Sequence, residues 1–310
     1  LEATLRTPFA ATPALSAFRM ALALASRGIQ RAEARGAPGD VAEVLDISQA
    51  FVHADMDRWV WTQVPKELDG MTFDTEEGEK ITLVAGEWLL VLKALYGFRP
   101  SPRLWQQHAV KLLASLGSKQ SKIEAMLFYN EEEKTWIVLH VDDLLVVGPR
   151  AAVDRLREQL SLQLNVRRVG WLEKPGDHTE YLGRDIRRVP GGFEVGVNQK
   201  LIEMVVRDLG LERCRYTPTP CVRYTDKQHE DSPYVEAEGV TPFRAALGKL
   251  MHLALDRWDL QFACKDIARG NCRLQEIHLW KLHRAVRFLW HHRSWKLRLV
   301  AKPGPVHVEA

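Results

Sequence analysis

Cysteine is scarce in this sequence, with four residues among 310. None of them forms a CxxC pair, so we expect neither a zinc site nor disulfides and interpret all four as reduced thiols of an intracellular protein. Long apolar runs are also missing, because none reaches the roughly 18–20 residues that cross a bilayer. No P-loop or GxGxxG motif precedes a helix, which argues against a nucleotide-binding fold of the usual kind.

The remaining composition is that of an ordinary folded protein. Hydrophobic residues make up 46% and charged residues 27% of the chain. A length of 310 residues suits two or three compact units. Because the first residue is Leu1 and not Met, we expect a piece of a longer protein.

The net charge of +3 alone identifies no partner. Basic residues do gather in two regions, although a single cluster of this kind is better interpreted as a solvated face. The clusters are Arg184, Arg187, Arg188, Lys200 and Arg207, and then Arg284, Arg287, Arg293, Lys296 and Arg298.

Hydrophobic periodicity predicts a mixture of helices and strands. Helices are predicted at residues 12–28, 101–117, 153–164, 198–209, 242–255 and 275–290. Strands are predicted at 41–47, 59–64, 88–92, 136–141 and 144–147, in a hairpin at 181–197, and at 296–300 and 306–309. The acidic segment 66–79 is expected to be an exposed excursion, and the proline-rich segment 217–233 a linker.

The most informative segment is 135–147, in which two apolar strands flank Asp142 and Asp143. This pattern predicts a β-hairpin with two carboxylates at its turn. One interpretation is a solvated turn, because turns favour Asp. The other is a metal site, because two like charges beside an apolar core need a cation. Mg²⁺ held by one or two carboxylates and by substrate phosphates is the usual solution.

Asp46 strengthens the metal interpretation. It lies near the end of the predicted strand 41–47, and its carboxylate would meet the hairpin tip if both strands share one sheet. Three carboxylates can hold two metals about 3.5–4 Å apart, an arrangement suited to in-line displacement at phosphorus. One metal would then lower the pKa of an attacking 3′-hydroxyl, and the other would stabilise the leaving pyrophosphate.

Five motifs occur in a fixed order along the chain. They are LDISQAFVHAD at residues 45–55 with VWTQVP at 60–65, LKALYGFRPSPRLW at 92–105, HVDD at 140–143, YLGRDI at 181–186, and residues 214–220 with 243–251. In this order they resemble the first and second palm motifs, the YVDD motif, the primer-gripping hairpin, and the thumb end and connection of copia-type retrotransposon reverse transcriptases. A single match could arise by chance, but five in family order make chance a poor explanation.

The resemblance implies an α+β right-hand polymerase fold of fingers, palm and thumb, with a connection region and the start of an RNase H-like domain. Fingers and palm would occupy 1–172, and the primer-grip hairpin, thumb and linker 173–235. Connection helices would follow at 236–295 and a truncated RNase H start at 296–310. The palm would be a small antiparallel sheet backed by helices. Because the chain stops before the first RNase H aspartate, no RNase H activity is expected.

The resemblance also implies roles for individual residues. Asp46, Asp142 and Asp143 would be catalytic and would hold Mg²⁺, or Mn²⁺ in its place. Phe51 would be the steric gate against a 2′-hydroxyl, with a core aromatic as the alternative. The nucleotide and template side would be lined by Tyr96, Gly97 and Arg99. The salt-sensitive contacts to nucleic acid would come from Tyr181, Leu182, Gly183, Arg184, Arg187 and Arg188.

The implied reaction is RNA-directed DNA synthesis, with an RNA template, a DNA primer and dNTPs as partners, and possible contacts to other parts of a Pol polyprotein. A cytoplasmic virus-like particle or the nucleus, and no membrane, would be its setting. Three departures from the family matter: His140 replaces Tyr, Trp258 replaces Pro, and most of the fingers is missing, leaving Arg19 as a candidate triphosphate contact.

Two alternatives stay open. A catalytically silent relic that at most binds RNA–DNA duplex is favoured by the missing fingers and by His140, and opposed by the three retained aspartates. A two-metal nuclease would use the same carboxylates, but it leaves Phe51 and the Tyr96-Gly97 motif without explanation.

Overall fold

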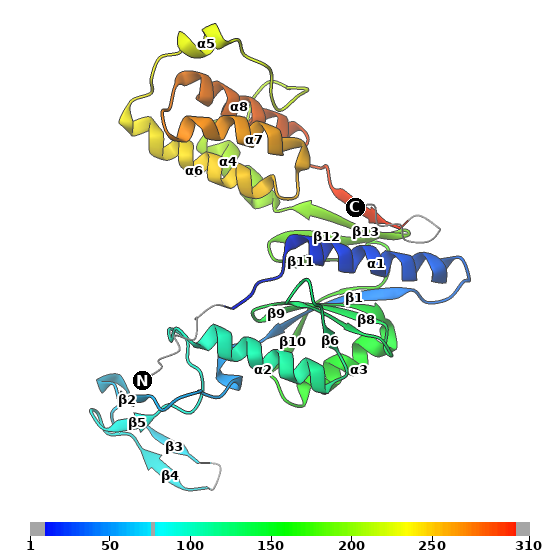
Figure 1. Ribbon diagram of the computed structural model, residues 1–310, viewed down its shortest axis with the longest axis vertical. Coiled ribbons are helices and arrows are strands. Elements are labelled where there is room, and N and C mark those ends of the chain that lie inside the picture. Colours follow the sequence, from blue (N-terminus) through cyan, green and yellow to red (C-terminus); the bar gives the residue numbers. More distant parts are fainter. Residues whose placement is uncertain (1–9, 76–77, 302–310) are drawn as a thin grey trace. The chain divides into compact units, whose positions relative to one another are not determined.

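The structure is a computed structural model that describes residues 10–75 and 78–301. The chain divides into two compact units, of which the first ends at Trp171 and the second begins at Leu172 (Figure 1). Each unit has its own cluster of buried apolar side chains. Of the helices described, none combines the length and the apolar character needed to cross a bilayer.

The first unit is built around a six-stranded sheet with the order β10-β1-β9-β8-β7-β6. Its central strands are apolar and almost completely buried, as expected for strands covered on both faces. The strands are β1 (Asp40–Ile47), β6 (Lys119–Gln120), β7 (Leu127–Asn130), β8 (Thr135–His140), β9 (Asp143–Pro149) and β10 (Val166–Leu172). The paired strands from β1 to β6 are antiparallel, in agreement with the mixed helix and strand class predicted from the sequence.

Helices cover both faces of this sheet. Figure 1 shows α1 (Leu15–Glu33) on one face, with α2 (Ser101–Ser115) and α3 (Arg150–Ser161) on the other. The helices predicted at 101–117 and 153–164 are thus present as α2 and α3, but α2 ends two residues earlier, and α3 begins and ends three residues earlier than predicted. The apolar stripes of α2 and α3 pack against Leu45 and Leu144, which face the same side of the sheet.

The first helix continues to Glu33, past Gly28, the residue at which the sequence pattern predicts its end. A Cβ at Gly28 would lie 1.9 Å from Oδ2 of Asp40, at the start of β1. The glycine therefore permits a close approach between helix and strand. This contact depends on a residue twelve positions away and leaves no trace in local periodicity.

The segment between β1 and α2 carries short elements, most of which are exposed. They are η1 (Ala50–His53), β2 (Trp61–Gln63), η2 (Lys66–Leu68), β3 (Thr72–Asp74), β4 (Lys80–Thr82) and β5 (Trp88–Leu90). β2 pairs with β5, and β3 pairs with β4. The strands predicted at 59–64 and 88–92 are thus present in shortened form, and the described part of 66–79 is mostly exposed as expected.

The second unit combines a four-stranded sheet of order β11-β12-β13-β14 with a cluster of helices. Its strands are β11 (His178–Tyr181), β12 (Arg184–Val189), β13 (Gly192–Val197) and β14 (Leu297–Val300). Its helical elements are α4 (Gln199–Asp208), α5 (Asp226–Glu230), α6 (Ala237–Leu253), η3 (Trp258–Leu260), α7 (Gln261–Ala268), η4 (Arg269–Asn271) and α8 (Glu276–His291).

Several details of the second unit differ from the prediction. The hairpin predicted at 181–197 is β12–β13, but β11 adds a further strand that ends at Tyr181. α6 begins at Ala237 and accommodates Pro242, and α7 was not predicted at all. The strand predicted at 296–300 is β14, which pairs with β13 as an edge strand of this sheet. The strand predicted at 306–309 lies outside the described residues.

Candidate active site

Asp46 and Asp143 lie directly opposite each other in the sheet of the first unit. β1 and β9 are antiparallel neighbours whose register pairs Asp46 with Asp143. The backbone N–H of Ile47 donates to the carbonyl oxygen of Asp142 at 2.8 Å. Cross-strand partners present their side chains on the same face of a sheet. The two separate sequence segments that carry the aspartates therefore meet at one end of the central strands.

The hairpin turn consists of Val141 and Asp142, one residue earlier than the Asp142–Asp143 turn that we predicted. Asp143 is already the first residue of β9 and pairs with His140. Val141 has a φ of 56°, a left-handed conformation that is unfavourable for a β-branched residue. Such a conformation costs on the order of 1–3 kcal/mol and persists only where surrounding contacts hold it.

Trp105 provides a contact that holds this turn. Its ring is almost completely buried in the first unit, and its Nε1–H donates to the carbonyl oxygen of Val141 at 2.6 Å. A buried indole needs an acceptor for its N–H group, but nothing in the sequence indicates that this acceptor lies at the turn. α2 thereby fixes the backbone from which Asp142 and Asp143 project.

The carboxylates repel one another at this end of the sheet. Burial, and then the charges of Asp142 and Asp46, raise the pKa of Asp143, while His140 lowers it to a smaller extent. Nη2 of Arg167, on β10, lies 3.2 Å from Oδ2 of Asp46 and neutralises part of this charge. Crowded carboxylate oxygens are the donors that a hard divalent cation prefers.

The arrangement is not a closed metal site as it stands. Within residues 10–75 and 78–301, no three His, Cys, Asp or Glu side chains converge tightly enough to hold a metal ion. Asp46 is engaged with Arg167. Arg167 would therefore compete with a metal ion for Oδ2 of Asp46, and the carboxylate donors fit a hard cation such as Mg²⁺.

Phe51 and Tyr96 come into contact near the aspartate end of β1. Phe51 lies in η1, and its ring centroid is 4.6 Å from that of Tyr96. Phe51 is half-buried against the core, and Tyr96 is 59% exposed. The two aromatic residues singled out from separate motifs thus form one partly accessible surface. Gly97 and Arg99 are exposed beside Tyr96 in sequence.

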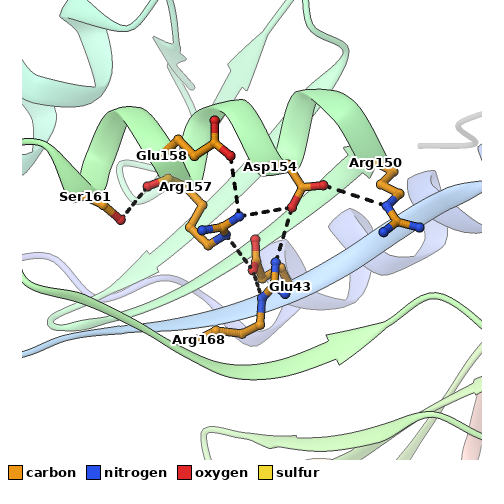
Figure 2. Close-up of polar contacts among 7 residues, drawn as sticks. All are labelled: Glu43, Arg150, Asp154, Arg157, Glu158, Ser161 and Arg168. Atoms are coloured by element: carbon orange, nitrogen blue, oxygen red, sulfur yellow. Dashed lines mark hydrogen bonds and ion pairs between the residues drawn. The ribbon is translucent and has the colours of Figure 1, made fainter.

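β1 also carries a buried carboxylate on the face of the sheet opposite to Asp46. Glu43 has no exposed surface, and Arg168 of β10 donates to its Oε1. Nε of Arg157, on α3, lies 3.4 Å from the same oxygen. Asp154 accepts from both arginines at 3.3 Å (Figure 2). Burial raises the pKa of Glu43, and Arg168 and Arg157 oppose this shift.

This network links β1, β10 and α3 at a point three residues before Asp46. Two adjacent arginines of β10 form ion pairs on opposite faces of the sheet. Arg168 pairs with Glu43, and Arg167 pairs with Asp46. Sequence reasoning missed Glu43 because it treated 41–47 only as an apolar strand. A lone charged residue inside that strand was the available signal, since buried charges need partners.

The hairpin residues that we expected to contact nucleic acid differ in whether they are buried or exposed. Arg184 is buried, and its Nε donates to Asp256 at 2.8 Å. Arg188 is also buried and donates to carbonyl oxygens of Val189 and Gly192. These two guanidinium groups have partners within the second unit, so a phosphate contact by either of them stays a prediction that its burial does not favour.

The other members of this group have different positions. Tyr181 is buried at the end of β11, and Leu182 and Gly183 form the β11–β12 turn with φ angles of 50° and 72°. Only Arg187 among the three predicted arginines is exposed. Arg187 is therefore the predicted arginine whose position allows a contact with a phosphate without rearrangement.

Comparison with known proteins identifies the family of the chain. Residues 32–223 match a family model described as "Reverse transcriptase (RNA-dependent DNA polymerase)". The chain is 23% identical over 258 residues to a transposon Ty5-1 protein of Saccharomyces cerevisiae, which covers 82% of this chain and 78% of that protein.

Two plant polyproteins are also similar. The retrovirus-related Pol polyprotein from transposon RE1 of Arabidopsis thaliana is 25% identical over 207 residues, and that from transposon RE2 is 23% identical over 200 residues. Each match covers 64% of this chain but only 13% of the polyprotein.

Proposed function

The chain belongs to the reverse transcriptase (RNA-dependent DNA polymerase) family of copia-type retrotransposons, and from this premise we propose that it performs two-metal nucleotidyl transfer. A dNTP would be joined to the 3′-hydroxyl of a DNA primer on an RNA template. The observation that carries the proposal is the register that pairs Asp46 with Asp143 beside the Val141–Asp142 turn. The contact between Phe51 and Tyr96 supports it independently.

Asp46, Asp142 and Asp143 would hold the catalytic Mg²⁺ ions, which when bound activate the attacking hydroxyl and stabilise the leaving pyrophosphate. The chain's own residues prepare this site. The raised pKa of Asp143 reflects a carboxylate that gains from a nearby cation. Arg167 partly neutralises Asp46 until a metal replaces it. Trp105 fixes the turn, so that little reorganisation is needed when substrate binds.

Phe51 and Tyr96 would position the incoming nucleotide. A flat apolar ring against the sugar leaves neither space nor a hydrogen-bond partner for a 2′-hydroxyl, so deoxynucleotides would be preferred. Tyr96 is sufficiently exposed to contact the nucleotide from the neighbouring segment. Its backbone neighbour Gly97, with a φ of 91°, adopts a conformation that suits glycine.

The polymerase assignment extends to the organisation of the chain. We assign the fingers and palm to 1–172, the primer-grip hairpin, thumb and linker to 173–235, the connection to 236–295 and an RNase H start to 296–310. The RNA template, the DNA primer, dNTPs and other Pol segments are the proposed partners.

Primer extension on an RNA template tests this proposal. The chain should elongate a DNA primer on an RNA template with Mg²⁺. Asp142→Asn should abolish elongation, because it keeps the shape of the side chain but removes the charge that binds the cation. Duplex binding should be retained, since it depends on basic residues elsewhere.

Asp74→Asn is the matched control, because Asp74 is exposed on β3. It should elongate the primer like the parent. Duplex binding by the parent without elongation under any divalent metal would favour the silent relic. Full activity of Asp142→Asn would refute the assignment of the metal site.

A further inference from the structure

The second unit contains a cleft that has no part in the proposed polymerase chemistry. It has a volume of about 790 Å³ and lies among residues of the segment 221–234 and of helices α7 and α8. The segment is anchored, because Gln275 Nε2 donates to the carbonyl oxygens of His229 and Ser232 at 3.0 and 2.8 Å. The backbone N–H of Ile277 donates to Ser232 Oγ at 3.0 Å. The cleft wall formed by this segment is thus attached to the start of α8.

A buried cation forms the floor of the cleft. Lys281 is only 6% exposed, and its Nζ lies 2.7 Å from Oδ2 of Asp266 and 3.2 Å from Nε2 of His229. Nζ is also 5.5 Å from the centroid of the Tyr224 ring. Lys281 thereby fixes Asp266, His229 and Tyr224 relative to one another. A buried lysine with several partners is a costly feature that gives this cleft a defined shape.

The cleft carries positive charge. Four Lys or Arg side chains and two Asp side chains line it, which leaves a net charge of +2 with both histidines neutral. Arg269 and Arg273 are exposed at its rim. Arg269 lies 3.5 Å from Asp266, so the carboxylate is shared with Lys281 and does not cancel both cations. An anionic ligand is therefore favoured.

Aromatic rings lie beside these cations. Phe262 is 70% exposed and Tyr234 is 57% exposed, and both line the cleft. The guanidinium carbon of Arg273 lies 4.5 Å from the centroid of the Tyr234 ring. Exposed rings beside arginines are the elements with which proteins bind single-stranded nucleic acid, because bases stack on the rings and phosphates meet the cations.

We propose that this cleft binds one or two nucleotides of single-stranded nucleic acid. A base would stack on Phe262 or Tyr234, and the backbone phosphate would contact Arg269 and Arg273. The volume lies in the range of small-molecule pockets, roughly 300–1,000 Å³, which admits single nucleotide units but not a double helix. This is a second nucleic-acid site, separate from the aspartates of the first unit.

Fluorescence anisotropy with a labelled single-stranded oligonucleotide tests the proposal on the full chain. Phe262→Ala should weaken binding about 5- to 150-fold, which corresponds to the stacking of one base. Arg273→Gln should reduce the slope of log K against log salt by about 0.7, the value for one phosphate contact on a single strand. Both residues are exposed, so both variants should unfold at the parent's melting temperature.

Controls separate this site from others. Arg207→Gln removes an exposed arginine of α4, and Trp280→Ala removes an exposed ring of α8 outside this cleft; both should bind like the parent. Asp142→Asn should also retain single-strand binding, so loss of polymerase activity and loss of this site are distinguishable. An oligonucleotide containing 4-thiouridine should crosslink to peptides that carry Tyr234 or Phe262.

Three results would overturn the proposal. The first is equal affinity of Phe262→Ala, Arg273→Gln and the two control variants. The second is competition by RNA–DNA duplex as strong as that by single strands. The third is competition by a mononucleotide as strong as that by the oligonucleotide, which would identify a free nucleotide as the occupant.

Discussion

Arg168→Ala is expected to destabilise the first unit by about 2–4 kcal/mol. The substitution leaves Glu43 fully buried on β1 without its closest counter-ion. Removing one partner of a buried ion pair typically costs about 3–5 kcal/mol, because the other charge stays uncompensated. Arg157 remains 3.4 Å from Glu43 and offsets part of this loss, so the expected value is somewhat smaller.

The partner variant Glu43→Gln should behave differently. Burial already raises the pKa of Glu43 despite both arginines, so the folded state does not fully compensate its charge. Arg168 is 42% exposed at its side chain and reaches water once Glu43 is neutral. We therefore expect Glu43→Gln to cost less than about 1 kcal/mol, and the double variant to recover most of the loss caused by Arg168→Ala.

The pH dependence has a defined sign. A buried carboxylate whose folded-state pKa is raised takes up a proton more readily in the folded than in the unfolded state. The destabilisation by Arg168→Ala should therefore shrink as the pH falls toward the raised pKa of Glu43 and the carboxylate becomes protonated. The difference in the free energy of unfolding between Arg168→Ala and the double variant should shrink over the same pH range.

Hydrogen exchange of the β1 and β9 amides measures the destabilisation caused by Arg168→Ala in the first unit alone. Arg167→Ala is the matched control: it removes the adjacent arginine of β10, which is 71% exposed and pairs with Asp46. An exposed pair contributes about 0–1 kcal/mol, so this variant should remain close to the parent. Equal protection in Arg168→Ala and Arg167→Ala, or additivity in the double variant, would refute the reasoning.

Three further predictions concern the same unit. Burial raises the pKa of Asp40 to about 6, so its ionisation costs stability at neutral pH. Asp40→Asn should thus stabilise the unit by about 1–3 kcal/mol at pH 7, at about 1.4 kcal/mol per pKa unit, and by almost nothing at pH 4 in urea unfolding; an equal gain at both pH values would contradict this cause. Phe51→Ala should increase ribonucleotide incorporation in primer extension, and unchanged selectivity would assign Phe51 to the core alone. Arg167→Ala should lower the Mg²⁺ concentration for half-maximal extension by up to about fivefold, because it removes a competitor for Asp46; a higher requirement would show that Arg167 assists metal binding.

Sequence patterns were sufficient where structure depends on local periodicity. The strands 41–47, 136–141 and 144–147 and the helix starting at Ser101 follow directly from apolar spacing. The meeting of Asp46 with Asp143 followed from placing two carboxylates at the ends of strands in one sheet. The sequence alone does not show that the two strands share a sheet, whereas the register of β1 against β9 does.

The remaining features depend on partners that are distant in sequence. The burial of Arg184 is explained by Asp256, which lies 72 residues further along the chain. The one-residue shift of the turn between β8 and β9 involves Trp105, 36 residues before Val141. Neither partner is visible in a window of ten or fifteen residues. Charged side chains were therefore interpreted as exposed, because that is their usual position.

The pairing of β14 with β13 has a consequence for how the second unit folds. β14 pairs with β13 in a register that joins Gly192 to Val300, so more than a hundred residues separate the partners. During synthesis from the N-terminus, β13 emerges long before β14 and presents an unpaired edge while the helices between them fold. Contacts between residues so far apart in the sequence form slowly. Until β14 pairs with β13, the exposed edge of β13 can pair with a strand of another chain. The step most exposed to misassembly in the described part of this unit is thus the pairing of β14 with β13.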